Sequence, residues 1–124
     1  MANVYEDAYL TQGVNALVAL GNRIGLYTST GARVGTVYAD TTWAAAVLSG
    51  SGANRVATRT GSEVTITVPA STVTAGTQIT HYGVLTGTTL LRKVDLEPVS
   101  ITVNRADMAF DVRVTPSLAF NPTE

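Results

Sequence analysis

The chain contains no cysteine, a single histidine and no long apolar run. Without cysteine it can form neither disulfides nor thiolate metal sites, so its stability must come from packing and hydrogen bonds. No apolar stretch approaches the roughly 20 residues that span a bilayer. Met1 to Asp7 also lacks the basic segment and following apolar stretch of a signal peptide. We therefore expect neither a membrane span nor a secretion signal.

Charge is equally scarce. Charged residues make up 14% of the chain, the formal net charge is -1, and the eight lysines and arginines are scattered. Proteins that bind nucleic acid through its phosphates usually carry a basic excess, so we expect no nucleic-acid partner. A surface with so few charges is typical of an ordinary low-charge β domain, and also of a chain that is buried against other subunits.

The residues that are abundant favour strands. Threonine is the most frequent residue, with valine and alanine next, and 45% of the chain is hydrophobic. Threonine and valine suit a pleated, half-buried surface, and 11 glycines suit many tight turns. A length of 124 residues fits one domain, so we expect residues 1–124 to form a single unit.

One segment near the start of the chain has helical periodicity. Between Glu6 and Leu20, apolar residues recur at helical spacing, namely Leu10, Val14, Leu17 and Val18. Gly21 and Asn22 supply a stop, whereas Gly13 inside the stripe weakens the pattern by about 1 kcal/mol relative to alanine. The sequence predicts a short helix over residues 6–20.

After this helix the periodicity changes to that of strands. Apolar residues alternate with polar ones in 63–68, 99–103 and 110–114. Residues 78–85 and 89–95, joined by Thr86-Gly87-Thr88, read as a β-hairpin. Because no β–α–β alternation occurs, the sequence predicts a mainly β fold: an antiparallel β-sandwich of about six to eight strands.

The remaining segments read as connections and ends. Residues 30–35 and 70–77 are predicted to be loops, and residues 104–107 are predicted to join the last two alternating segments as a second hairpin. Residues 1–5 form a predicted N-terminal arm. Residues 116–124 contain Pro122 and no clear periodicity, so we expect a C-terminal tail there.

Catalytic chemistry has little support. A Ser/His/Asp triad would need His81 as its base, but this residue lies inside a predicted strand beside Tyr82, where a structural role is the commoner one. Ser62 and Ser71 are conceivable nucleophiles, and neither sits in a Gly-x-Ser-x-Gly turn. We therefore expect no catalytic residues.

Binding of metals and cofactors has no support either. The carboxylates are dispersed, and only Asp95 and Glu97 would share a face, if their strand continued that far. No Asp-x-Asp calcium loop, no histidine cluster and no phosphate-binding Gly-x-x-x-x-Gly-Lys frame occurs. We expect no metal and no cofactor.

Four segments carry a resemblance to a known family. They are Ile24-Gly25-Leu26-Tyr27-Thr28, Thr42-Trp43-Ala44-Ala45-Ala46, residues 64–69, and residues 77–90, which include Ile79-Thr80-His81-Tyr82-Gly83. In this order they resemble small virion proteins of tailed phages, many of which infect actinobacteria, and the resemblance covers most of residues 10–115. The chain departs from that pattern at residues 29–38, where an acidic loop rich in proline and glycine is missing. The resemblance implies a β-sandwich without catalytic residues.

The first hypothesis that follows is a capsid decoration protein on the outer surface of the phage head, assembled in the host cytoplasm. Its partners would be the major capsid protein and further copies of itself, as trimers for example. Terminal arms could add strands to neighbouring subunits, and closed symmetry would cover exposed strand edges. The residues expected to make these contacts are Met1, Ala2, Asn3, Val4, Tyr5, Phe120, Asn121 and Pro122.

Two alternatives stay open at this point. One is a tail or fibre accessory protein built on the same sandwich but present in few copies. The other is a module that binds host glycans, for which Trp43 or Tyr82 would have to be exposed on a sheet face.

Overall fold

The computed structural model describes residues 6–96 and 100–121 of the chain, which form one α-helix, ten strands and a single 3₁₀ turn. In chain order these are α1 (Asp7–Val18), β1 (Arg23–Thr28), β2 (Arg33–Asp40), β3 (Val47–Ser49), η1 (Gly52–Asn54), β4 (Val56–Thr60), β5 (Val64–Val68), β6 (Gln78–Thr86), β7 (Thr89–Asp95), β8 (Ile101–Thr102), β9 (Phe110–Val114) and β10 (Ser117–Phe120). Every strand pairing among them is antiparallel. The mainly β, antiparallel class with one helix near the N-terminus is confirmed.

The greater part of the molecule, which we call the body, is made of two sheets. The first, which we call the large sheet, has the strand order β2-β1-β6-β7, with the short β8 paired to the start of β6, and the second consists of β5 and β9. Side chains from both sheets meet in one core that includes Ile24, Ile66 and Val112, each at most 2% exposed. This arrangement is sandwich-like, because the two sheets cover each other's apolar faces.

The alternating segments of the sequence behave as predicted in this core. In β5, Val64, Ile66 and Val68 are buried, while the threonines between them are exposed. In β9, Val112 and Val114 are buried and the charged residues that alternate with them are exposed. The hairpin of β6 and β7 is also confirmed, with Thr86 opposite Thr89 at the turn.

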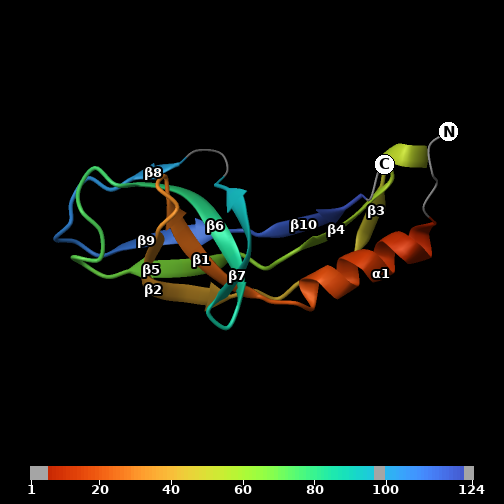
Figure 1. Cartoon of the computed structure of the whole chain (residues 1–124), viewed down its shortest axis with the longest axis horizontal. Helices are drawn as coiled ribbons and strands as arrows, with labels where there is room; N and C mark the ends of the chain where they lie inside the picture. Colours follow the sequence, from red (N-terminus) through yellow and green to blue (C-terminus); the bar gives the residue numbers. More distant parts are fainter. Residues whose placement is uncertain (1–5, 97–99, 122–124) are drawn as a thin grey trace.

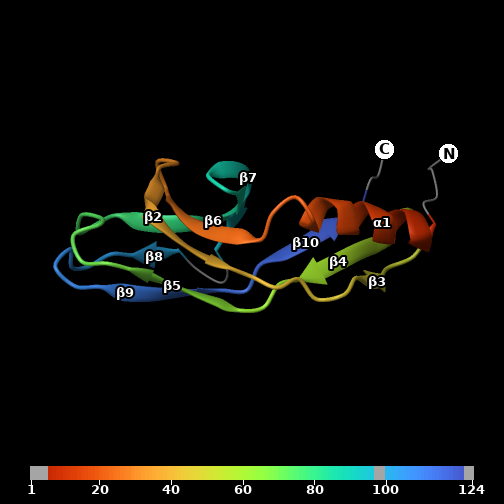
Figure 2. The same ribbon diagram turned by 90° about the horizontal axis from the view of Figure 1, so that it is seen from below.

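A long two-stranded ribbon connects the body to the rest of the molecule. One side of the ribbon is β4 followed by β5, and the other is β9 followed by β10 (Figure 2). β4 pairs with β10, and β5 pairs with β9. Between these two pairings, the N–H of Gly61 donates to the carbonyl of Pro116 at 2.8 Å. The same two segments of the chain thus form two successive antiparallel pairings, which follow one another along the long axis of the molecule (Figure 2).

The smaller part, which we call the helix lobe, consists of α1 packed on the sheet β10-β4-β3 (Figure 1). Its core cluster consists of Leu10 and Val14 of the helix and Ala57 of β4. The predicted helical stripe is confirmed at Leu10, Val14 and Val18, whereas Leu17 is 39% exposed. Leu17 lines the open cavity between the helix lobe and the body, together with Val18 and Leu118, and this leaves part of its side chain exposed.

Gly13, which weakened the helix prediction, has a packing role. A Cβ atom at this position would lie 2.2 Å from Cε2 of Phe120. The glycine therefore lets the ring of Phe120 approach the helix backbone, and its cost in helix propensity is offset by this contact.

The predicted second hairpin is wrong. β8 pairs with β6 in the large sheet, whereas β9 pairs with β5 in the other sheet. Residues 104–107 therefore connect the two sheets and do not close a hairpin. The sequence shows that both segments alternate, but alternation does not say which strand each one pairs with.

Two other boundaries differ from the sequence predictions. Residues 117–120 of the expected tail form β10, which pairs with β4 over four residues. The expected loop at residues 30–35 is shorter, because β2 begins at Arg33. β2 pairs with β1, the strand just before it in the chain, whereas β10 is a strand because the distant β4 pairs with it, which is a non-local cause.

Candidate functional site

His81 was the only candidate for a general base, and the structure places it in a chain of hydrogen bonds. Its Nε2 lies 2.7 Å from Oδ1 of Asp95 on β7, and its Nδ1 lies 2.7 Å from Oγ1 of Thr80. His81 and Asp95 are direct cross-strand partners, and the Asp95 side chain is 80% exposed. An ion pair or hydrogen bond in this setting links β6 to β7 at the surface, as cross-strand pairs commonly do.

The serines considered as nucleophiles do not join this chain. The Oγ of Ser62 accepts a hydrogen bond from the N–H of Thr42 at 3.0 Å, and the N–H of Ser71 donates to the carbonyl of Ala106 at 2.6 Å. Among the described residues, the side-chain hydrogen-bond partners of His81 are Thr80 and Asp95 alone. The shared face considered for Asp95 and Glu97 required the strand to continue to residue 97; β7 ends at Asp95, and Glu97 lies outside the described residues.

Residues 6–96 and 100–121 provide neither a metal site nor a membrane-spanning helix. No group of three or more histidine, aspartate or glutamate side chains in this part of the chain is placed to hold a metal ion. No helix within these residues is both long and apolar enough to cross a bilayer.

The predicted contact residues divide into two groups. Met1, Ala2, Asn3, Val4, Tyr5 and Pro122 lie outside the described residues. Phe120 belongs to β10 and packs inside the helix lobe, with its ring centroid 6.2 Å from that of Tyr9. Asn121 follows it and is exposed. Phe120 thus has a structural role in its own chain, and its role as a partner contact stays a prediction.

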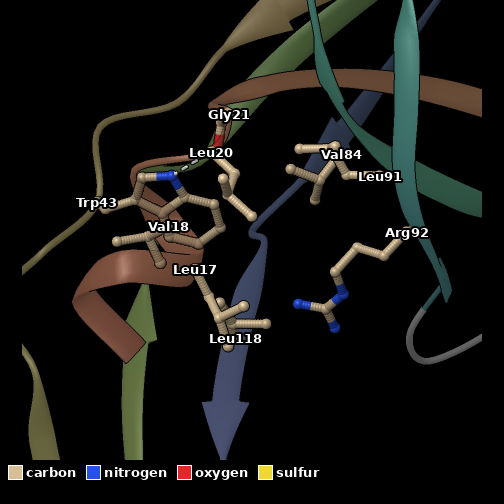
Figure 3. A pocket seen from close by; sticks show the side chains of 9 residues that line it. All are labelled: Leu17, Val18, Leu20, Gly21, Trp43, Val84, Leu91, Arg92 and Leu118. Carbon is tan, nitrogen blue, oxygen red and sulfur yellow. Dashed lines mark hydrogen bonds between the residues drawn. The ribbon is translucent and has the colours of Figure 1, made fainter. Parts of the chain in front are cut away.

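An apolar cavity lies where the helix lobe meets the body (Figure 3). Its volume is about 100 Å³, and it is lined by Leu17, Val18, Leu20, Gly21, Trp43, Val84, Leu91, Arg92 and Leu118. Leu20 is 55% exposed and Leu91 is 40% exposed, so the rim reaches the solvent. Cavities for cofactors and drug-sized ligands measure about 300–1,000 Å³. This one is smaller, with room for about one apolar side chain.

Hydrogen bonds fix the walls of this cavity relative to one another. The indole Nε1 of Trp43 donates to the carbonyl of Gly21 at 3.2 Å (Figure 3). Across the cavity, Nη1 of Arg92 donates to the carbonyl of Ser117 at 3.1 Å, and the N–H of Ser117 donates to the hydroxyl of Tyr82 at 3.2 Å. Hydrogen bonds therefore hold the junction on both sides of the cavity, and the cavity is already present in the isolated chain.

The small sheet of the helix lobe has a second surface that no described element covers. Register places Leu48, Ala57 and Leu118 on the side of α1, where they pack against the helix core. Their neighbours along each strand face the other way. The residues on that face are Val47, Ser49, Val56, Thr58, Thr60, Ser117 and Ala119. None of them is charged, and Val47 is 65% exposed. We call this surface the helix-free face.

The edges of the same sheet are short and open. Within the described residues, β3 and β10 each pair with β4 and with no other strand. Both backbone groups of Ser117 are already used, by Tyr82 and Arg92. Two residues further along, the N–H and C=O of Ala119 point toward the same edge. An unpaired strand edge is a template for a strand from another chain.

The aromatic residues considered for glycan binding do not form an exposed platform. Tyr82 is 5% exposed and belongs to the body core. Trp43 is half-buried and holds the junction through its indole N–H. Tyr82 therefore does not meet the condition that the glycan-binding alternative set, because it shares the inward-facing row of β6 with Val84.

Sequence reasoning did not find the junction cavity or the helix-free face. The alternation Leu118–Phe120 is a weak strand signal in a strand of four residues, and the cavity is assembled from five separate segments. Comparison with known proteins gives no further guide: no family model, no curated protein and no solved structure matches the chain.

Proposed function

We propose that the chain is a structural protein of a bacteriophage particle, and specifically a decoration protein on the outer surface of the capsid. The observation that carries the proposal is the uncharged helix-free face with its open edges. A face made of valine, threonine, serine and alanine can be buried against another subunit without leaving a charge unpaired. The resemblance of residues 10–115 to small virion proteins supports the same function.

The helix lobe supplies the means of attachment in this proposal. Its sheet offers Ala119 at the edge of β10 for backbone pairing, and the junction cavity offers room for one apolar side chain. Residues 1–5 and 120–122 flank the two ends of the lobe in sequence. They are the segments through which a neighbouring capsid subunit, or another copy of the chain in a trimer, would be contacted.

The proposal assigns no catalytic step to the chain. It interprets the His81–Asp95 pair as a link between β6 and β7. The runner-up, a tail or fibre accessory protein, would use the same surfaces, so the two functions differ in copy number and location and not in chemistry.

The decisive experiment measures the amount of the chain in purified phage particles by quantitative mass spectrometry. A decoration protein repeats with the symmetry of the shell, so we expect on the order of hundreds of copies per particle. A few copies or a few tens would favour the tail accessory function. Absence from particles would overturn the proposal.

A pair of variants tests the surface itself. Val47→Lys places a charge on the helix-free face at a position that is 65% exposed, so the isolated chain should fold normally. Its incorporation into particles should fall by about tenfold or more, because the charge would be buried unpaired. Thr102→Lys, an exposed strand position on the body, is the matched control and should be incorporated like the unmodified chain. Equal incorporation of both variants would contradict attachment through this face.

A further inference from the structure

The outer face of the large sheet, opposite the core, has a composition unlike the helix-free face. Because Ile24 and Leu26 point into the core, Gly25 and Tyr27 face outward. Direct cross-strand partners share a face, and register therefore defines three outward rows. They are Arg33, Tyr27, His81 and Asp95; then Tyr38, Gly25, Gly83 and Lys93; then Asp40, Arg23, Leu85 and Leu90.

The middle row has two adjacent positions without side chains. Gly25 lies directly opposite Gly83. A Cβ at Gly83 would lie 2.4 Å from Cε2 of Tyr27, and a Cβ at Gly25 would lie 3.6 Å from Nε of Arg33. The ring of Tyr27 and the guanidinium of Arg33 therefore lie over the glycine pair, close to the backbone of the sheet. Cδ1 of Leu85 and Cδ1 of Leu90 also lie over it, 3.2 Å and 2.8 Å from a Cβ at Gly25 and Gly83.

A second cation reaches the same place from β7. The Nζ of Lys93 lies 5.4 Å from the centroid of the Tyr27 ring, and a Cβ at Gly31 would lie 3.5 Å from it. Lys93 thus extends across Tyr27 toward the turn between β1 and β2. Arg33 and Lys93 both approach one buried aromatic residue, which is 5% exposed.

Not every cationic side chain on this face has a carboxylate partner. The carboxylate of Asp40 lies 3.7 Å from Nε of Arg23, and that of Asp95 lies 2.7 Å from Nε2 of His81. Among the described residues, no carboxylate lies within 4.0 Å of Arg33 or Lys93. The two acidic side chains of the face are engaged elsewhere, and two cations are left over.

The Nε of Arg33 also lacks an acceptor. This atom is buried, and no described residue accepts a hydrogen bond from it. A buried donor without an acceptor costs about 1–3 kcal/mol, and more when the group is charged. Native proteins contain few such groups, and a binding site for an ion or a water commonly accounts for those that occur.

We infer that this face binds a small oxyanion, such as phosphate, sulfate or a carboxylate group, between Arg33 and Lys93. A guanidinium presents its N–H groups in a planar fork that matches two oxygens of such an anion, and an ammonium supplies a second point charge. Asp40 and Asp95 do not compete, because each has a partner. This site does not depend on attachment to a particle.

The test is an NMR titration of the full isolated chain with sodium phosphate, with sodium chloride at equal ionic strength as the reference. Phosphate should produce saturable amide shifts at the β1–β2 turn and along the rows of Tyr27 and Gly83. Sulfate and acetate titrations then distinguish the class of anion. Identical responses to phosphate and chloride would overturn the inference.

Variants identify the groups that bind. Arg33→Gln should weaken phosphate binding by about tenfold or more, and Lys93→Gln should weaken it by a smaller factor, because only the guanidinium offers the two-pronged contact. Arg113→Gln removes the same charge from the outward side of β9, on the opposite sheet, and its affinity should match that of the unmodified chain.

A conservative variant separates charge from geometry and guards against misfolding. Arg33→Lys keeps the charge without the fork and should bind with intermediate strength. If Arg33→Gln does not fold, Arg33→Lys and Lys93→Gln carry the test. Undiminished phosphate binding in these variants would contradict the site.

Discussion

The body and the helix lobe are built from the same kinds of strand, but their cores differ greatly in size. The body buries 12 residues from two sheets in one cluster, including Leu26, Ile66 and Ile79. The helix lobe buries Leu10, Val14 and Ala57, with four partly buried residues around them. Each fully buried aliphatic side chain contributes about 1.5–3 kcal/mol. The body can therefore be stable by itself, whereas the lobe depends on its connection to the body.

This difference indicates which part of the molecule gains most from a partner. The lobe has a small core, an uncovered uncharged face and open strand edges. The body has a complete core, and its outer face carries paired charges and two cations. Regions with few buried contacts open at lower free energy than the rest of a protein. Burial of the helix-free face would stabilise the region that is weakest in the isolated chain.

The largest expected effect comes from a deletion in the body core. Ile66 is 1% exposed and lies between the two sheets. Ile66→Ala should lower the free energy of unfolding by about 3 kcal/mol, since it removes buried methyl groups and leaves a cavity. Urea denaturation followed by circular dichroism measures this change. Thr65→Ala, at the exposed neighbouring position, is the control, and a similar loss there would contradict the assignment of faces.

A comparable deletion in the lobe should have a smaller global effect. Leu10 is 1% exposed at the centre of the helix lobe. Leu10→Ala should lower the global free energy of unfolding by about 2 kcal/mol, because the loss cannot exceed what the lobe contributes. Amides of α1, β3 and β4 should then exchange faster, and at a free energy that stays below that of β1 and β6, whose exchange follows the lowered global value. One common free energy of exchange for both regions of Leu10→Ala would show that the molecule unfolds as one unit.

The contact between Gly13 and Phe120 can be measured by a double-mutant cycle. In the Phe120→Ala background, Gly13→Ala should stabilise the chain by about 1 kcal/mol, since alanine favours helix. In the unmodified chain that gain should vanish or reverse, because the new Cβ would meet the ring of Phe120. Urea denaturation of the four proteins gives the coupling energy. The same gain in both backgrounds would mean that the ring does not lie against the helix.

The smallest effect concerns pH and the start of the helix. The Arg55 side chain donates hydrogen bonds to both carboxylate oxygens of Asp7, at 2.8 and 3.1 Å, and these bonds hold the pKa of Asp7 below its ordinary value of 3.8. The stabilisation is therefore present above pH 3.8 and is lost as the pH falls through the lowered pKa. Both groups are exposed, so the effect is small.

A cycle of three variants checks this pH dependence. Asp7→Asn and Arg55→Gln should each remove the same part of the decline in thermal stability below about pH 4, and the double variant should remove no more. Thermal melts from about pH 2 to about pH 6 provide the comparison, since this range spans the titration of aspartate. A steeper decline in Asp7→Asn than in the unmodified chain would contradict a lowered pKa for Asp7.

The pattern of apolar residues in the sequence was sufficient to predict the helix and those strands whose buried residues recur at one regular spacing. The alternation of Val64, Ile66 and Val68 identified β5, and the stripe of Leu10, Val14 and Val18 identified the helix. The hairpin of β6 and β7 could be predicted because its turn is short and local.

Features that depend on pairing between distant segments could not be predicted in this way. The assignment of β8 to one sheet and β9 to the other is set by packing, and β10 is a strand because β4 lies beside it. The outward rows that bring Arg33 and Lys93 to Tyr27 require the register of four strands. The junction cavity combines residues up to 101 positions apart, from Leu17 to Leu118.

The central claim is that a self-sufficient body carries a marginal helix lobe, which other subunits complete. Native-state amide hydrogen exchange of the isolated chain tests it most directly. We predict that amides of β1, β5 and β6 exchange only through global unfolding, and that those of α1, β3 and β4 exchange through a separate opening of lower free energy. One common free energy of exchange for both regions would contradict the claim.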